Sequence, residues 1–258
     1  MSTSTPVSRT SLSPTTAAQL QAVLFDLDGT LMDHDAARAT GLQRHLAEWL
    51  PGTPAHELER LDEHWRELEA RHYDEYASGQ CSFAEQRRRR VRGMHDVLGR
   101  EVPPDESADE WFAGYLRHYR AQWRAFDDVL PALDALAAAQ PQLVLGVVTN
   151  GEGEPQRKKL EACGVEGRFA HVVASAEAGV AKPDAAIFAL ACERLGVERS
   201  RTAHVGDRLD LDAHGAAAAG LRGVWLDRPG AVKHAMPEPA LEVTTISTLH
   251  ELVDALAA

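Results

Sequence analysis

Short apolar segments alternate with longer amphipathic ones along most of the chain. The apolar runs are rich in valine or leucine, end in polar or glycine residues, and cover residues 22–28, 142–149, 171–175, 202–206, 223–227 and 243–247. Runs without polar alternation are typical of strands buried on both faces, as in a parallel sheet. Helical faces separate the later runs; one is formed by Ile187, Phe188, Ala191 and Leu195. This alternation predicts a doubly wound, parallel α/β sheet.

One long segment, residues 35–125, contains no strand-like run. Its apolar residues recur at helical spacing, and Ser82 with Glu85 forms a capping box at the start of a helix. A structureless loop of this length would be unusual in a compact domain. We therefore expect an all-helical insert that packs over the carboxyl edge of the sheet.

The pattern predicts three segments. Residues 21–34 and 126–258 would form the α/β core domain, and residues 35–125 the helical cap domain. Residues 1–20 are rich in serine and threonine and lack the apolar stretch of a secretory signal, so we expect a disordered tail. An organelle-targeting role for this tail stays open.

Composition narrows the classes of function. The 258 residues are 44% hydrophobic and 26% charged, as in ordinary globular proteins. A net charge of −12 argues against nucleic-acid binding. No apolar run approaches the roughly 18 residues that a membrane span needs. The three cysteines, Cys81, Cys163 and Cys192, form no CxxC pair, which favours reduced thiols and a cytoplasmic location.

Polar residues follow several predicted strands. Asp26 and Asp28 end the first run, and Gly29 permits a sharp turn that can bring both carboxylates towards one point. Asp-Gly is also common in simple turns, so a structural role is the alternative. Asp207, Asp210 and Asp212 follow the run at 202–206; they would repel each other unless a cation or a basic group lies among them.

Two further segments carry groups that could bind an anion. Thr149, Asn150 and Gly151 end a strand ahead of a helix, where a hydroxyl, an amide and free backbone N–H groups favour anion binding. A capped helix start is the alternative. Lys182 precedes the helix predicted at 184–195, and a solvated surface lysine is its alternative role.

Together these segments predict one site, because ligands of open α/β sheets bind outside the carboxyl ends of the strands. The site would combine a carboxylate nucleophile, a second carboxylate, hydroxyl and amide donors, a lysine and an acid that binds metal. Phosphoryl transfer requires such groups.

In this order, the segments resemble the four motifs of the haloacid dehalogenase superfamily of hydrolases, specifically its phosphatase branch. The resemblance covers about residues 21–230, and its most specific motif is Asp26-Leu27-Asp28-Gly29-Thr30-Leu31. The stretches Thr149-Asn150-Gly151 to Lys159-Leu160 and His204 to Gly220 resemble members that act on nucleoside 5′-monophosphates and acylneuraminate 9-phosphates. The position of the insert is similar to that of the helical-cap subgroup, which implies a Rossmann-like core with an inserted all-helical cap.

The resemblance also implies the catalytic roles. Asp26 would be the nucleophile, and Asp28 the general acid and base. The substrate phosphate would be bound by Thr149, Asn150, Gly151 and Lys182. Among these, Thr149 and Lys182 would also assist catalysis.

A magnesium ion is the implied cofactor. Its ligands would be the Asp26 carboxylate, the Asp28 backbone carbonyl and Asp207, because oxygen donors suit a hard cation. Asp212 would not bind the metal directly but would support the metal or Lys182 from the next layer of residues.

The resemblance assigns no role to two groups of charged residues. Arg208 and Asp210 depart from the usual fourth motif. The run Arg87-Arg88-Arg89-Arg90 in the predicted cap is either a solvated helix face or supplies an arginine that binds an acidic substrate.

These observations predict a Mg²⁺-dependent phosphatase that hydrolyses a small phosphorylated metabolite through an aspartyl-phosphate. The alternatives are a phosphomutase, a 2-haloacid dehalogenase and a catalytically silent binding protein. Dehalogenation releases no alcohol that needs a proton, so it would leave Asp28 without a role. The substrate, the cap residues that select it, and the choice between monomer and homodimer stay open.

Overall fold

The protein is described by a computed structural model that covers residues 19–230 and 241–257. It contains a six-stranded sheet in the order β3-β2-β1-β4-β5-β6, with every neighbouring pair parallel. The strands are β1 (Ala22–Phe25), β2 (Val144–Thr149), β3 (His171–Ala174), β4 (Thr202–Gly206), β5 (Arg222–Leu226) and β6 (Thr244–Ile246). The predicted fold class is confirmed. Residues 1–18, most of the expected tail, lie outside the described residues.

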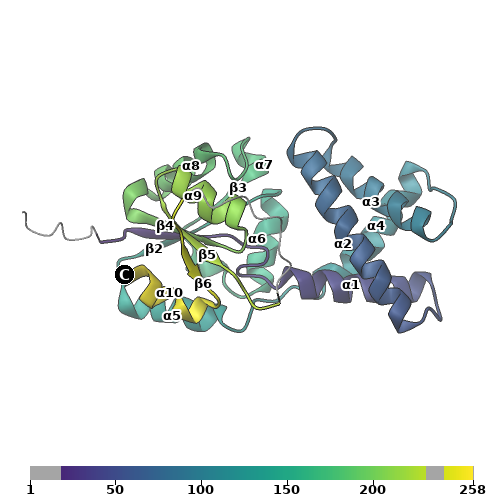
Figure 1. Ribbon diagram of the computed structural model, residues 1–258, viewed down its shortest axis with the longest axis horizontal. Helices are drawn as coiled ribbons and strands as arrows, with labels where there is room; N and C mark the ends of the chain where they lie inside the picture. Colours follow the sequence, from purple (N-terminus) through teal and green to yellow (C-terminus); the bar gives the residue numbers. More distant parts are fainter. Residues whose placement is uncertain (1–18, 231–240, 258) are drawn as a thin grey trace, which may run out of the picture.

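Helices cover both faces of the sheet (Figure 1). Those of the core are α5 (Val129–Ala139), α6 (Gly153–Ala162), α7 (Ser175–Ala178), α8 (Ala185–Leu195), α9 (Gly215–Ala218) and α10 (Leu252–Ala257). Side chains of β1 alternate between two apolar clusters: Val23 and Phe25 belong to the one that includes α5 and α10, and Leu24 to the one that includes α8 and α9. This alternation explains why the strand is apolar at every position.

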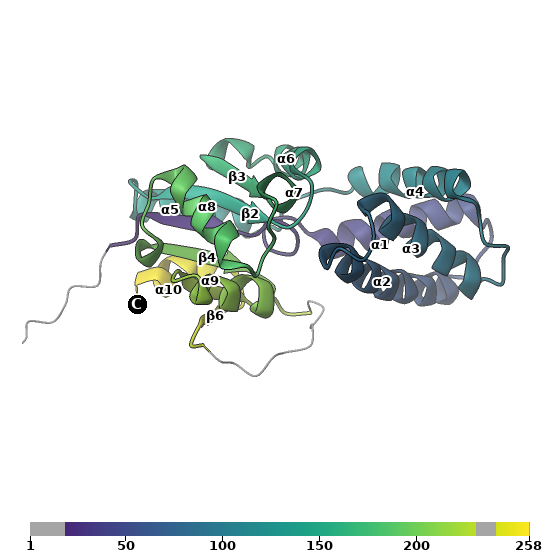
Figure 2. The same ribbon diagram turned by 90° about the horizontal axis from the view of Figure 1, so that it is seen from above.

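The residues between β1 and α5 form four helices that lie beyond the carboxyl ends of the strands (Figures 1 and 2). They are α1 (His34–Trp49), α2 (Ala55–Ala77), α3 (Phe83–Val97) and α4 (Asp105–Arg120). We refer to these four helices as the cap. None of the described helices is long and apolar enough to cross a membrane.

Aromatic packing holds the cap together. Trp65 is fully buried, and its ring centroid lies 5.3 Å from that of Trp111 and 4.9 Å from that of Tyr115. Ser82 caps α3 as the sequence predicts, since its Oγ accepts a hydrogen bond from the Glu85 N–H at 3.1 Å, while the Glu85 carboxylate accepts from Arg89 and Arg92. The apolar spacing in the sequence therefore reflects packing within the cap, whose buried residues belong to the same apolar cluster as Val23 and Phe25 of β1.

Two chain segments connect the cap to the sheet, and they lie side by side. Met32 forms an antiparallel bridge with Ala125, and the Asp33 N–H donates to the Arg124 carbonyl at 3.1 Å. The cap therefore leaves and rejoins the core at one place. We propose that this pair of segments divides the chain into the two domains that the sequence suggests.

Candidate active site

A cavity of about 680 Å³ lies between the carboxyl ends of the strands and the cap. All eight residues expected in the site line it, namely Asp26, Asp28, Thr149, Asn150, Gly151, Lys182, Asp207 and Asp212. They come together because the parallel strands are in register: Phe25 pairs with Val147 on one side and Val205 on the other. The polar residues that follow these strands therefore reach the same edge of the sheet.

Lys182 lies between two buried carboxylates. Its Nζ is 2.5 Å from Asp26 Oδ1 and 2.7 Å from Asp212 Oδ1. Asp212 is also held by His204, whose Nε2 lies 3.1 Å from Oδ1, and by the Arg208 N–H, which donates to Oδ2 at 3.0 Å. Asp212 is therefore a positioning group for the lysine.

The surroundings of these groups shift their protonation in opposite directions. Burial raises the pKa of Asp26 to about 6, although the charge of Lys182 opposes this effect. Burial also acts to raise the pKa of Asp212, but Lys182 and His204 outweigh it and the net pKa is lowered. Burial disfavours the Lys182 cation, yet Asp212 and Asp26 together raise its pKa. Lys182 therefore stays cationic between these carboxyl groups.

Asp207 fits the chemistry of a cation ligand. Carboxylate oxygens of Asp26, Asp207 and Asp212 lie within 4.8 Å of one another. The buried Asp207 Oδ1 has no hydrogen-bond partner within residues 19–230 and 241–257. Burial and the charges of Asp26 and Asp212 raise the pKa of Asp207 well above its usual range. A hard divalent cation would satisfy this oxygen and offset the repulsion, so the donor set fits Mg²⁺.

The loop after β1 makes room for Asp207. Gly29 has a φ of +88°, and a Cβ added there would lie 2.4 Å from Asp207 Oδ2. The Thr30 hydroxyl accepts a hydrogen bond from the Asp207 N–H at 3.0 Å. Gly29 is therefore needed both for the turn and for close approach of the carboxylate.

Asp28 makes contacts that the sequence analysis did not predict. Lys159 Nζ lies 2.7 and 2.6 Å from its two carboxylate oxygens, and Gln156 Nε2 donates to Oδ2 at 3.2 Å. His34, the first residue of α1, places Nδ1 3.8 Å from Oδ1. Burial acts to raise the pKa of Asp28, but the charges of Lys159 and His34 outweigh it, so the net pKa is lowered. Asp28 is therefore held ionised here.

The sequence did contain a signal for the contacts of Gln156 and Lys159 with the site. Gln156 and Lys159 lie three residues apart on α6, directly after the segment Thr149–Gly151, so they share a helix face. That helix begins at the carboxyl end of β2, and this face points towards the site. The location of Asp28 opposite it could not be predicted from spacing alone.

The segment after β2 also links parts of the site. Thr149 Oγ1 accepts a hydrogen bond from Gln156 Nε2 at 2.5 Å. The Asn150 side chain donates to the Lys182 carbonyl at 3.1 Å and accepts from the Lys182 N–H at 2.9 Å. The Gly151 N–H donates to Ser175 Oγ at 2.9 Å. The amide of Asn150 therefore fixes the backbone that carries the lysine.

The two residues left unassigned in the fourth motif pair with each other. Arg208 Nε and Nη2 donate to the two carboxylate oxygens of Asp210 at 3.0 and 2.9 Å. This bidentate contact occupies both groups. Both therefore have a structural explanation that needs no substrate.

Comparison with known proteins identifies the family of the chain. The model of haloacid dehalogenase-like hydrolases matches residues 20–220. The glyceraldehyde 3-phosphate phosphatase of Methanopyrus kandleri is 32% identical over 212 residues, which are 81% of this chain and 84% of that protein. The pyrimidine 5′-nucleotidase YjjG of Escherichia coli is 38% identical over 122 residues; the match covers 47% of this chain and about half (53%) of that protein.

Solved structures agree on the fold. YfnB of Bacillus subtilis, a hydrolase bound to magnesium, superposes with a TM-score of 0.76 at 23% identity, over 93% of this chain and 100% of that one. The 2-haloacid dehalogenase of Pseudomonas syringae has a TM-score of 0.62 at 30% identity, over 93% and 99% of the two chains. The expected resemblance is confirmed, and the expectation of a phosphoric monoester hydrolase agrees with the names of the curated relatives. The chain belongs to the family of haloacid dehalogenase-like hydrolases.

Proposed function

We propose that this protein is a Mg²⁺-dependent phosphatase that acts on a small phosphorylated metabolite through an aspartyl-phosphate at Asp26. The observation that carries the proposal is the contact of Asp26 with Lys182 beside the oxygens of Asp207 and Asp212, on the wall of the cavity. Relatives named for glyceraldehyde 3-phosphate and N-acylneuraminate 9-phosphate support a small phosphate ester as substrate.

In the first half of the reaction, a carboxylate oxygen of Asp26 attacks phosphorus and the bond to the leaving oxygen breaks. Asp28 donates a proton to that oxygen, and the alcohol departs. The Thr149 hydroxyl and the Asn150 backbone N–H would hold phosphoryl oxygens. The charge of Lys182 favours the transition state, in which negative charge is spread over these oxygens.

In the second half, a water molecule attacks phosphorus and gives its proton to Asp28. The bond between phosphorus and Asp26 breaks, which releases inorganic phosphate and restores both carboxyl groups to their starting states. Lys159 would control this cycle. Its contact with Asp28 keeps that carboxylate ionised in the free protein. A bound substrate phosphate would attract Lys159, and Asp28 would then take up from solvent the proton that it donates in the first half.

The residues that would hold Mg²⁺ are Asp26 and Asp207 through their carboxylates and Asp28 through its backbone carbonyl. When bound, the ion supplies positive charge next to the phosphoryl group. Asp207 Oδ1, which has no hydrogen-bond partner among the described residues, supports this choice.

Dehalogenation is the competing activity, because a 2-haloacid dehalogenase is among the structural relatives. Displacement of halide needs no proton donor. The three side chains that hold Asp28, namely His34, Gln156 and Lys159, therefore favour phosphate ester hydrolysis.

Hydrolysis of p-nitrophenyl phosphate with and without Mg²⁺ tests the proposal. We expect nitrophenol release that needs Mg²⁺, is abolished by EDTA, and falls at least about 10³-fold in Asp26→Asn. Release of chloride from 2-chloropropionate without phosphatase activity would instead identify a dehalogenase. Full activity in Asp26→Asn would refute the assignment of the nucleophile.

A further inference from the structure

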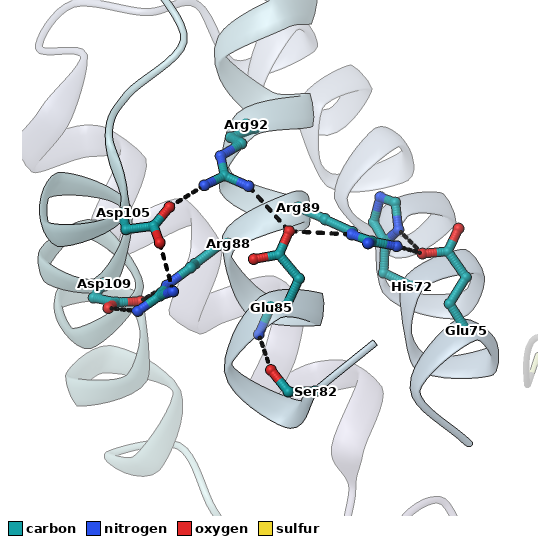
Figure 3. A network of polar contacts seen from close by, with 9 residues as sticks. All are labelled: His72, Glu75, Ser82, Glu85, Arg88, Arg89, Arg92, Asp105 and Asp109. Carbon is teal, nitrogen blue, oxygen red and sulfur yellow. Dashed lines mark hydrogen bonds and ion pairs between the residues drawn. The ribbon is translucent and has the colours of Figure 1, made fainter. Parts of the chain in front are cut away.

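The arginine-rich helix α3 presents two different faces. Arg88, Arg89 and Arg92 take part in the network of Figure 3, where each contacts carboxylates of the cap. Arg88, for example, donates to Asp105 at 2.7 Å and to Asp109 at 2.6 Å. The charges of these three arginines are therefore already matched by acids of the cap.

Arg87 and Arg90 share another face, three residues apart, and both line the active-site cavity. Arg90 is buried, and its Nη2 lies 2.8 Å from the Glu69 carboxylate. Arg87 forms no ion pair in the described part of the chain. Its guanidinium carbon lies 4.1 Å from the ring centroid of Phe83 and 5.2 Å from that of Phe112. The two rings position the cation without neutralising it.

Most arginines of the cavity have an acidic partner. Those that do are Arg38, Arg90, Arg208 and Arg228. Of the remaining lining arginines, Arg120 is exposed, whereas Arg66 and Arg87 are half-buried. Burial lowers the pKa of Arg87; Glu152 opposes this effect, and the charges of Arg90 and Arg120 add to it. Although the charges of Glu152 and Asp109 act on Arg87, no carboxylate of the described residues forms an ion pair with it, so its guanidinium is free to pair with an anion in the cavity.

We propose that Arg87 binds a second anionic group of the substrate, a carboxylate or a second phosphate on the part that leaves as the alcohol. This inference rests on the proposed phosphatase function and adds to it. The phosphoryl-transfer groups lie on the core wall of the cavity and Arg87 lies on the cap wall. A cavity of about 680 Å³ has the size of a metabolite site. A substrate with one anion at each end would therefore pair with both walls.

Competition assays against p-nitrophenyl phosphate test this subsite. The probes are 3-phosphoglycerate and glycerol 3-phosphate, which differ in a carboxylate, and fructose 1,6-bisphosphate and fructose 6-phosphate, which differ in a phosphate. Each is measured as a competitor, so a reading is obtained whether or not it is hydrolysed. We expect the wild type to bind the doubly anionic member of at least one pair about tenfold more tightly, as one charge-assisted hydrogen bond allows.

The variants decide whether Arg87 is responsible. In Arg87→Ala the ratio of inhibition constants within that pair should fall towards one, and Arg87→Lys should retain part of it. Arg88→Ala, which removes a neighbouring charge that faces the acids of Figure 3, should keep the wild-type ratio. A ratio is unaffected by the fraction of correctly folded protein. The pair that responds tells whether the bound anion is a carboxylate or a phosphate.

Two results would contradict the inference, and they differ from failure of the proposed function. If the wild type does not distinguish the members of either pair, or if Arg87→Ala keeps the wild-type ratio, the subsite is refuted while the phosphatase stands. If the wild type does not hydrolyse p-nitrophenyl phosphate at all, the proposed function fails, and the subsite with it.

Discussion

At the scale of single residues, the contacts of Asp212 explain why Asp26 is the better placed nucleophile. Lys182 contacts both carboxylates, but His204 and the Arg208 N–H hold Asp212 in addition. Burial of Asp26 raises its pKa to about 6, whereas the pKa of Asp212 is lowered. The ionised form of Asp26 is therefore less stabilised by its surroundings than that of Asp212. Asp212 therefore orients Lys182, and the lysine in turn contacts the carboxylate of Asp26.

The raised pKa of Asp207 predicts a conflict between stability and metal binding. The unfolded chain loses this proton near pH 4, roughly, whereas the folded protein keeps it to higher pH. The metal-free protein should therefore lose stability as the pH rises from about 4 towards the raised pKa. Asp207→Asn removes this loss, so above neutral pH and with EDTA it should be more stable than the wild type by on the order of 1 kcal/mol.

Urea unfolding at pH 5 and pH 8 measures this effect. Added Mg²⁺ should stabilise the wild type, because a ligand that binds only the folded state raises its stability. It should leave the stability of Asp207→Asn unchanged, because this variant lacks the carboxylate that would bind the ion. A variant that is less stable than the wild type at pH 8 in EDTA would contradict the role given to Asp207.

Lys159 predicts a second effect at this scale. Lys159→Met removes the cation that the substrate phosphate would attract away from Asp28, so kcat/KM for p-nitrophenyl phosphate should fall about 10- to 100-fold. Lys158→Met is the matched control, since Lys158 is exposed and pairs with Glu154 at 2.7 Å. Steady-state kinetics of both variants measure whether Lys159 takes part in catalysis. Equal rates in the two variants would show that Lys159 has no part in catalysis.

At the scale of secondary structure, much of the core could be predicted because buried parallel strands are apolar without interruption. The run at 202–206 coincides with β4, and the run at 171–175 differs from β3 by one residue. The first run extends past β1, which ends at Phe25, because the buried Leu27 continues the apolar pattern beyond the end of the strand. Hydrophobic pattern identifies buried residues, and a buried loop has the same pattern as a strand end.

The contacts between helices and strands were harder to predict from the sequence than the strands themselves. The motifs indicated which residues reach the carboxyl edge of the sheet, and all eight expected residues do line the cavity. The pairing of Lys159 with Asp28, and the approach of His34, depend on how α6 and α1 lie relative to β1. Helical periodicity defines a face but does not determine what it contacts. The same reason left the orientation of the arginine run open.

The loop after β1 can be tested by adding one methyl group. Gly29→Ala would place Cβ 2.4 Å from Asp207 Oδ2 at a φ of +88°. It should therefore lose stability, by about 1–2 kcal/mol from the backbone alone, and also weaken Mg²⁺ activation at least about tenfold. Gly164→Ala is the control, since Gly164 also has a positive φ, +68°, but a Cβ there meets nothing within 4 Å.

Unfolding and Mg²⁺ titrations of activity separate the two effects. The control should lose a similar amount of stability and keep the wild-type dependence on Mg²⁺. If Gly29→Ala responds to Mg²⁺ as the wild type does, close approach of Asp207 to the loop has no part in the site.

At the scale of the whole molecule, the chain separates two tasks. The sheet brings together the groups for phosphoryl transfer, and residues of the helices inserted after β1 line the opposite wall of the cavity. The connecting segments lie side by side at Met32 and Ala125, so the whole cap is inserted at one place near the strand ends. This arrangement explains why the motifs indicate the reaction while the substrate depends on residues such as Arg87.

The central claim is the covalent intermediate at Asp26, and trapping it is the most direct test. The protein is mixed with p-nitrophenyl phosphate and Mg²⁺, quenched in acid within the first turnovers, digested and analysed by mass spectrometry. We predict a phosphoryl group on the peptide that contains Asp26, present only during turnover and absent in Asp26→Asn. Rapid turnover with no phosphoryl group on that peptide, together with an active Asp26→Asn variant, would contradict the account.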